Sequence, residues 1–224
     1  MDRKRTFALA AIVMAAACGY VLSAASEERP AAATTTVKLS APALKGAVSI
    51  EEAIAKRRSI RQFAPGEVTM EQLSQLLWAA QGVTDKASGH RAAPSAMAKY
   101  PLEVYVVKAD GLFKYVPAEH ALTKLKDGDL RKDISGQGSV AQAPVSLVIT
   151  VNYDELAGRY AKMAQRFGDF EAGAASENVF LQAAALGLGS VAVGGIDDAQ
   201  VAKVIGAAAN ETPVIVIPIG KPAV

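Results

Sequence analysis

Hydrophobic residues recur along the chain at two spacings, and each spacing predicts one kind of element. Within residues 69–82, Leu73, Leu76, Leu77 and Ala80 return every three or four positions. This is the period of one face of a helix. The pattern therefore predicts a helix over this stretch.

A strict alternation marks the first expected strand. Leu102, Val104 and Val106 occupy one face of residues 102–107, and Glu103 lies on the other. Other stretches predict strands at 145–151, 190–193 and 213–219, an Ala-rich helix at 174–188 and a short helix at 197–206. Strands separated by helices of unequal length, without a repeat, predict a single α+β domain.

Two helix starts carry signals of their own. Ser49 with Glu52, and Thr69 with Gln72, have the spacing of a capping box, in which two side chains satisfy free backbone N–H groups. The first of these helices runs into the basic segment 57–61. We therefore expect the domain to begin near Ser49.

Three stretches show neither period. Residues 26–47 are rich in Ala, Thr, Pro and Lys and are interpreted as a linker, so the domain is expected at residues 48–224. Residues 83–100 are expected to form a loop, because they hold Gly, Ser, Pro and His without periodicity. Residues 108–139 carry scattered turn signals and predict no definite element.

The first 25 residues differ from the rest. A basic head at residues 3–5 precedes an unbroken apolar and small-residue run from Phe7 to Ala25. This order is typical of a secretory signal peptide. The alternative is an uncleaved membrane anchor, since the run approaches the ~20 residues that span a bilayer. Ala, which is weakly apolar, dominates the run, so cleavage and export to the periplasm are expected.

Charge and cysteine content narrow the function classes once residues 1–25 are set apart. The net charge then falls from +2 to zero, because the excess of basic residues lies in the leader. A neutral domain gives no case for nucleic acid or an anionic membrane as partner. The single cysteine, Cys18, also lies in the leader. His90 and His120 lack neighbouring ligand residues, so no metal site is expected.

The segment Arg-Arg-Ser-Ile-Arg at 57–61 is the strongest candidate for a binding site in the sequence. Arg offers forked, permanently charged donors and Ser adds a short hydroxyl donor, and together they suit a phosphate monoester. The alternative is that these cations only interact with solvent and with the C-terminal end of the helix dipole.

Small residues mark two further places. Residues 91–97 form a stretch of mostly small residues that leads toward a strand, and Val193, Gly194 and Gly195 follow another strand. Small side chains let a flat ring approach backbone N–H and C=O groups. Ordinary surface turns are the alternative interpretation of both.

Taken together and in order, these segments resemble the nitroreductase family of flavin mononucleotide (FMN) enzymes, and within it the SagB-type branch of peptide dehydrogenases. The resemblance covers residues 49–222. It rests on the segments at 57–63, 73–82, 93–105, 142–144, 178–189, 194–198 and 218–220.

The resemblance implies a three-layer α/β/α fold with a mostly antiparallel central sheet flanked by helices, bound FMN, and a homodimer with two sites between its subunits. For the phosphate and ribityl end of FMN it implies contacts from Arg57, Arg58, Ser59 and Arg61, with Lys221 as a further basic residue. For the flavin ring it implies contacts across the dimer interface from Pro94, Ser95, Ala96 and Met97. It also implies that Gln137 contacts the pyrimidine edge and that the backbone of Val193, Gly194 and Gly195 lies near the flavin N5.

The activity implied is two-electron transfer through the flavin to a small organic acceptor, such as a nitroaromatic or a quinone, with NAD(P)H as a candidate donor. An exported enzyme would need another donor, because nicotinamide cofactors are cytoplasmic. Two alternatives stay open: a SagB-like dehydrogenase that oxidises a peptide or other organic substrate, and a flavin-binding redox carrier or sensor. Arg159-Tyr160 stands where the peptide-oxidising branch has Lys-Tyr, which weakens that alternative because Arg stays protonated. No side-chain acid or base is assigned.

Overall fold

The computed structural model describes residues 35–223 of the 224-residue chain, apart from the side chains of Arg159 and Tyr160. The expected signal peptide at 1–25, with Cys18, lies outside the described residues. So does the first part of the expected linker.

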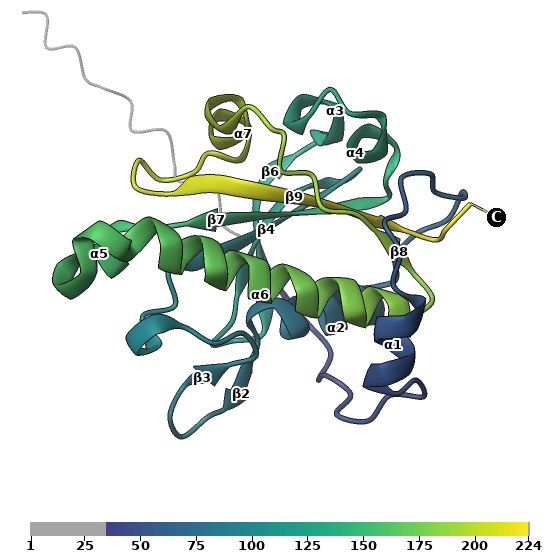
Figure 1. The fold of residues 1–224 in the computed structure, drawn as a ribbon. Helices are drawn as coiled ribbons and strands as arrows, with labels where there is room; N and C mark the ends of the chain where they lie inside the picture. Colours follow the sequence, from purple (N-terminus) through teal and green to yellow (C-terminus); the bar gives the residue numbers. More distant parts are fainter. Residues whose placement is uncertain (1–34, 224) are drawn as a thin grey trace, which may run out of the picture. The chain divides into compact units, whose positions relative to one another are not determined.

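A seven-stranded antiparallel sheet forms the middle of the fold (Figure 1), with the strand order β1-β6-β5-β4-β7-β9-β8. Its strands are β1 Thr36–Lys38, β4 Leu102–Lys108, β5 Gly111–Val116, β6 Ala121–Asp127, β7 Val145–Val151, β8 Gly189–Ser190 and β9 Thr212–Gly220. Every neighbouring pair in it is antiparallel. A small separate hairpin pairs β2 Val83–Asp85 with β3 His90–Arg91.

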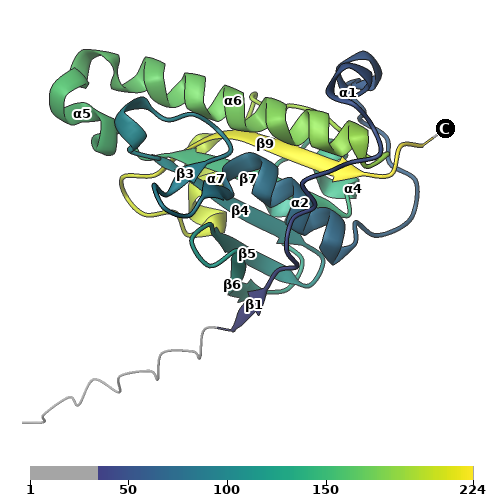
Figure 2. The same cartoon turned by 90° about the horizontal axis from the view of Figure 1, so that it is seen from below.

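Helices cover both faces of this sheet (Figures 1 and 2). One face carries α1 Ile50–Lys56, α2 Met70–Gln81, α5 Asp154–Tyr160 and α6 Ala164–Ala185; the other carries α3 Arg131–Ile134, α4 Gly138–Gln142 and α7 Asp198–Ile205. Two short 3₁₀ turns, η1 Ala96–Ala98 and η2 Ala161–Met163, complete the order. The predicted three-layer α+β fold is confirmed.

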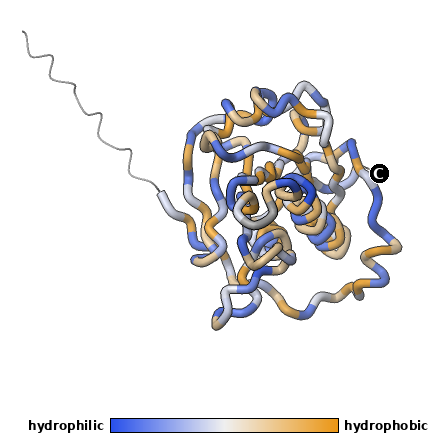
Figure 3. Tube along the Cα trace, turned by 60° about the vertical axis from the view of Figure 1, so that its left-hand side comes forward, coloured by the Kyte–Doolittle hydropathy of each residue, from blue (hydrophilic) through white to orange (hydrophobic). Residues whose placement is uncertain are grey.

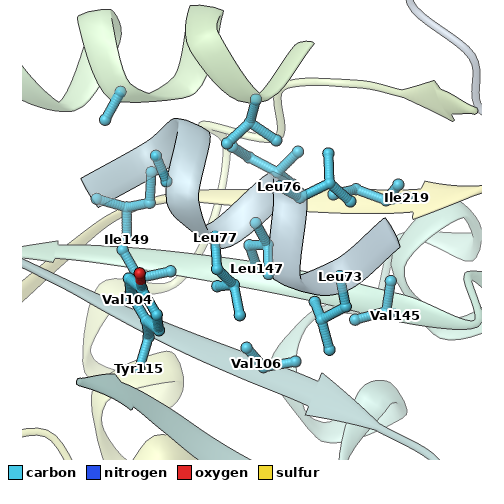
Figure 4. Close-up of a cluster of buried hydrophobic side chains, with 14 of the residues drawn as sticks. Leu73, Leu76, Leu77, Val104, Val106, Tyr115, Val145, Leu147, Ile149 and Ile219 are labelled. Atoms are coloured by element: carbon cyan, nitrogen blue, oxygen red, sulfur yellow. The ribbon is translucent and has the colours of Figure 1, made fainter. Parts of the chain in front are cut away.

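The main core lies between the sheet and the helices α2 and α6. Leu73, Leu76 and Leu77 of α2 point onto residues of β4, β7 and β9 (Figure 4), and all three are almost completely buried. Thr69 and Gln72 form the predicted capping box at the start of α2. Hydrophobic and hydrophilic residues are mixed along the trace in Figure 3, and the central strand β7 is buried at every position because helices cover both faces of the sheet.

Several elements differ from the prediction. β5 and β6 occupy residues 108–139, where no element was assigned, and α6 begins ten residues before the expected residue 174. β6 has two core residues at its start, Ala121 and Leu122, whereas Leu125, Lys126 and Asp127 are exposed, so no alternation marks this strand in the sequence. Gly111 adopts φ 153°, and a Cβ there would lie 2.5 Å from the Lys126 carbonyl oxygen. Only glycine therefore fits this tight entry to β5.

The end of the expected linker belongs to the fold, so the domain boundary predicted at residue 48 lies too late. β1 pairs with β6, and the Ser74 hydroxyl donates to the Ser40 carbonyl at 2.7 Å. The Gln75 side chain accepts from the Ala43 N–H at 2.8 Å and donates to the Ala43 carbonyl at 3.1 Å. Isolated three-residue edge strands carry too little periodicity to be found in a sequence.

The segment 36–47, the N-terminal arm, is joined to the core by hydrogen bonds of His120. Its Nε2 lies 2.9 Å from the Ser40 carbonyl oxygen and 2.8 Å from the Ser74 hydroxyl, and its Nδ1 lies 2.8 Å from the Tyr115 hydroxyl. A neutral ring with its proton on Nε2 satisfies all three contacts, since the Tyr115 hydroxyl then donates to Nδ1. Burial lowers the pKa of His120, although the Ser40 carbonyl raises it in part.

We predict a pH-dependent contribution of His120 to stability. Because the folded-state pKa lies below the unfolded value of about 6.5, the stabilisation is complete above that pH and is lost as the pH falls below it. His120→Asn tolerates the φ of 47° at this position but loses the contacts, so at pH 7.5 its free energy of unfolding should be about 1–3 kcal/mol lower. Urea unfolding followed by Trp78 fluorescence measures this. The difference should shrink at pH 5.5; equal differences at both pH values would contradict the assignment.

Candidate functional site

The basic segment 57–61 leaves α1 and runs beside β8 and the end of β9. The Ile60 N–H donates to the Ser190 carbonyl at 2.9 Å, and the Ala64 N–H donates to the Lys221 carbonyl at 2.8 Å. These backbone bonds hold the arginines and Lys221 at one end of the sheet, although they lie some 160 residues apart in sequence. The structure thus brings together the residues that sequence analysis grouped as phosphate ligands.

Two glycines allow this close approach. A Cβ on Gly189 would lie 2.7 Å from the side chain of Ile60, and one on Gly220 would lie 2.9 Å from the ring of Phe63. Both distances are too short for a real carbon–carbon contact. The basic segment can therefore lie flat on β8 and β9 only because neither position has a side chain.

The two leading arginines point to different partners. Arg57 Nε lies 4.0 Å from the Glu177 carboxylate of α6, and both side chains are partly exposed, so this ion pair is weak. Arg58 turns back and donates to the carbonyls of Ala55 at 2.9 Å and Arg57 at 2.7 Å. In this structure Arg58 therefore caps the C-terminal end of α1, as the alternative interpretation of the cluster expected.

The remaining polar side chains of this group are unengaged. Ser59, Arg61 and Lys221 are exposed, and their side chains form no hydrogen bond or ion pair with any residue between 35 and 223. Beside them is a cavity of about 210 Å³, lined by Lys56, Arg57, Arg58, Ile60, Phe180, Ala184, Gly187, Leu188, Ser190 and Pro222. This end of the molecule can accept an anionic group without first breaking strong internal ion pairs.

The small-residue loop at 94–97 has an unusual backbone. Met97, Ala98 and Tyr100 adopt φ values of 57°, 54° and 51°, a region that side chains other than glycine rarely occupy. The Ala96 N–H donates to the Glu171 carboxylate at 2.7 Å, and the Tyr100 N–H donates to the Ser95 hydroxyl at 2.7 Å. Pro94 and Met97 are exposed.

Gln137 meets the turn after β8. Its side-chain Nε2 donates to the Gly195 carbonyl at 3.2 Å, and the backbone of Val193 pairs with Val216 of β9. A Cβ on Gly194 or Gly195 would meet nothing within 4 Å. The turn therefore presents open backbone to its surroundings, and Gln137 lies beside it.

The predicted site residues form three groups within one chain. Glu171, which holds the loop, and Glu177, which faces Arg57, lie six residues apart on α6, about 9 Å along the axis. Across the described residues, no hydrogen bond or ion pair joins the loop at 94–97 to the basic segment or to Gln137. Sequence analysis missed Glu171, because the helix was expected to begin after it.

A larger groove lies between the N-terminal arm and the helices α1, α2 and α6. Its volume is about 740 Å³, and its walls include Ala53, Trp78 and Leu181. Leu44 and Ile50, which line it, are among the most exposed large hydrophobic side chains of the described residues.

Two searches of the described residues gave negative results. Between residues 35 and 223, no three His, Cys, Asp or Glu side chains lie together in a way that could hold a metal ion. No helix in that range is both long and apolar enough to cross a membrane.

Comparison with known proteins gives consistent matches. A model of the nitroreductase family matches residues 54–221. A protein of Methanocaldococcus jannaschii assigned as a nitroreductase is 34% identical over 184 residues, which cover 78% of this chain and 91% of that protein.

Solved structures agree. One assigned as a nitroreductase of Ralstonia eutropha has a TM-score of 0.79 and 33% identity, covering 84% of this chain and 90% of its own. A chain of the Escherichia coli microcin synthetase complex shares the fold, with a TM-score of 0.66 and 21% identity over 83% of this chain and 78% of its own. Because the family model spans most of the chain and two relatives exceed 30% identity, this chain belongs to the nitroreductase family.

Proposed function

We propose that this protein is an FMN-dependent oxidoreductase that transfers two electrons to a small organic acceptor such as a nitroaromatic or a quinone. The observation that carries the proposal is a basic group beside a cavity of about 210 Å³, formed by Arg57, which makes only a weak ion pair, and by the unengaged Ser59, Arg61 and Lys221. In a chain of the nitroreductase family, this group is suited to the phosphate of FMN.

The chemistry of these residues fits the cofactor. A phosphate monoester offers three strong acceptor oxygens and nearly two negative charges, which guanidinium, ammonium and hydroxyl donors match. At the other predicted contact, the bare backbone of Gly194 and Gly195 and the amide of Gln137 offer both donors and acceptors to a flat heterocycle.

When bound, FMN would supply the redox chemistry, taking up a hydride from a donor and passing two electrons to an acceptor. The chain itself would bind and orient. Arg57, Arg61 and Lys221 would fix the phosphate end, and the turn at 193–195 would set the backbone beside the ring. No side-chain acid or base is assigned within this division of work.

Two copies of the chain would build the site. No hydrogen bond or ion pair among the described residues joins the loop at 94–97 to the basic segment of its own chain, which leaves the loop available to a second copy. The apolar groove of about 740 Å³, with Leu44 and Ile50 exposed along it, supplies a surface that such a copy would cover. We propose a homodimer on these grounds.

The cellular setting is proposed from the sequence. The leader at 1–25 favours export to the periplasm, where a donor other than NAD(P)H would be required; retention in the cytoplasm would allow NAD(P)H. The SagB-like alternative of peptide oxidation rests on sequence resemblance, and the side chains of Arg159 and Tyr160 that bear on it are not described.

The phosphate assignment predicts that Arg57→Ala with Arg61→Ala weakens FMN binding about a hundredfold or more, because each lost charge-assisted hydrogen bond contributes about 1.5–3 kcal/mol. Titration of the FMN-free protein, followed by flavin fluorescence, measures the affinity. Lys86→Ala with Lys203→Ala removes the same charge from exposed positions elsewhere and should bind as the parent does. Unchanged affinity in a folded Arg57/Arg61 double variant would refute the phosphate site.

The redox assignment predicts a visible flavin band that a donor bleaches. NADPH added without oxygen should bleach the band of the FMN-loaded protein, and a quinone or nitroaromatic added afterwards should restore it. Dithionite serves as the control for flavin that can be reduced chemically. A band that dithionite bleaches and NADPH leaves intact would exclude NADPH as donor.

The dimer assignment predicts that Ile50→Glu halves the molar mass measured by light scattering. A charge at this position, which lines the groove and where 56% of the Ile50 surface is exposed in one chain, would have to be buried against the second copy. Lys203→Glu on α7, in the opposite helix layer, is the control and should remain dimeric. A parent chain that is monomeric at micromolar concentration would contradict the proposal.

A further inference from the structure

Among the described side chains of residues 35–223, which leave out Arg159 and Tyr160, Glu171 is the only carboxylate or cation that is buried, with 6% of its surface exposed. It lies on α6, whose neighbouring buried positions are mostly small and apolar. Burying a carboxylate costs several kcal/mol unless hydrogen bonds compensate. The buried Glu171 carboxylate therefore needs hydrogen-bond donors that offset the cost of its burial.

Its partners are both in the loop that precedes β4. The Ala96 N–H donates to the carboxylate at 2.7 Å, and the Ser95 side chain lies near enough to the carboxylate to lower its pKa. The Ser95 oxygen accepts from the Tyr100 N–H at 2.7 Å. One hydrogen bond therefore joins the start of the turn to α6, and a second one closes the turn between Ser95 and Tyr100.

That turn is strained. Met97, Ala98 and Tyr100 all have positive φ. Residues other than glycine cost of order 1–3 kcal/mol each in sparsely populated backbone regions, and they persist only where the surroundings impose the conformation. The bonds that act on this turn from the helix side are those of Glu171.

The other end of the turn is anchored separately. The Tyr100 hydroxyl accepts from the Arg91 N–H at 3.2 Å, and the Arg91 guanidinium lies 4.7 Å from the centre of the Tyr100 ring. Tyr100 is thus held to the β2–β3 hairpin, while Ala96 has only Glu171 as a side-chain partner. Removal of Glu171 would release the residues before Met97 and leave Tyr100 in place.

We propose that Glu171 is a positioning residue, whose carboxylate holds the loop of residues 94–98 in the strained shape that presents it to the flavin ring. The last clause rests on the proposed FMN function; the hold on the loop does not. Glu171 itself touches neither cofactor nor substrate in this assignment and acts through the backbone of Ala96.

The pKa of Glu171 is consistent with this role. Burial raises it, and the hydrogen bonds from Ala96 and Ser95 oppose the rise. The loop donors are therefore the groups that stabilise the charged form in an otherwise unfavourable place.

The first test uses the full chain without flavin. In Glu171→Met a side chain of similar length loses the acceptor, and hydrogen exchange of the amides at 95–98 should rise about tenfold or more. Glu171→Gln keeps a carbonyl acceptor and should restore most of the protection. Gln165→Met on the exposed face of α6 is the matched control. Unchanged exchange in Glu171→Met, or faster exchange throughout α6 and the sheet, would overturn the proposal.

The second test adds FMN. Glu171→Met should weaken FMN binding about tenfold and shift the visible absorption bands of the bound flavin, and Glu171→Gln should resemble the parent. If the parent binds FMN and Glu171→Met frees the loop without changing affinity or spectrum, the positioning role is overturned. If the parent binds no FMN, the proposed function fails, and the exchange experiment alone still decides whether Glu171 holds the loop.

Discussion

The packing of α6 against the sheet is the constraint on which the rest of the candidate site depends. Its buried face is built from small residues, Ala172, Ala175, Val179 and Ala183, so the helix lies close to the strands. This packing fixes the positions of two other side chains of α6. Glu171 accepts a hydrogen bond from the loop before β4, and Glu177 faces Arg57. A shift of α6 would move both contacts at once, because close-packed interiors deform in discrete steps rather than smoothly.

Sequence patterns located the elements whose signals are local. The capping box of Thr69 and the leucines of α2 act within one helix turn or two, and the alternation in β4 needs only its own residues. β1 and β6 show no clear pattern, because β1 has only three residues and the second half of β6 is exposed. Opposite Leu112 and Phe113 of β5, a register shift leaves Leu125 as an extra residue and further breaks the period of β6.

The same distinction separates the site residues. The basic segment was recognisable because its chemistry is concentrated in five positions, yet only the fold shows that Arg58 caps α1 while Arg61 stays unengaged. Glu171 carried no local signal. Its partner Ala96 lies 75 residues away in the sequence. A single glutamate at the start of an Ala-rich stretch has the pattern of an exposed helix residue, and only the folded structure shows that a loop covers it.

A site built in this way uses backbone where other enzymes use side chains. Glycines at 189 and 220 let the basic segment lie against the sheet, glycines at 194 and 195 leave a turn open, and a buried carboxylate holds a strained loop. A bound flavin would bring the reactive atoms itself, so the protein's contribution reduces to where its N–H groups, carbonyls and charges are held. The positions of these groups are then set by close packing and by hydrogen bonds between residues far apart in the sequence. Substitutions far from the reacting atoms, in α6 or at the two close-approach glycines, would accordingly disturb the chemistry as much as changes beside them.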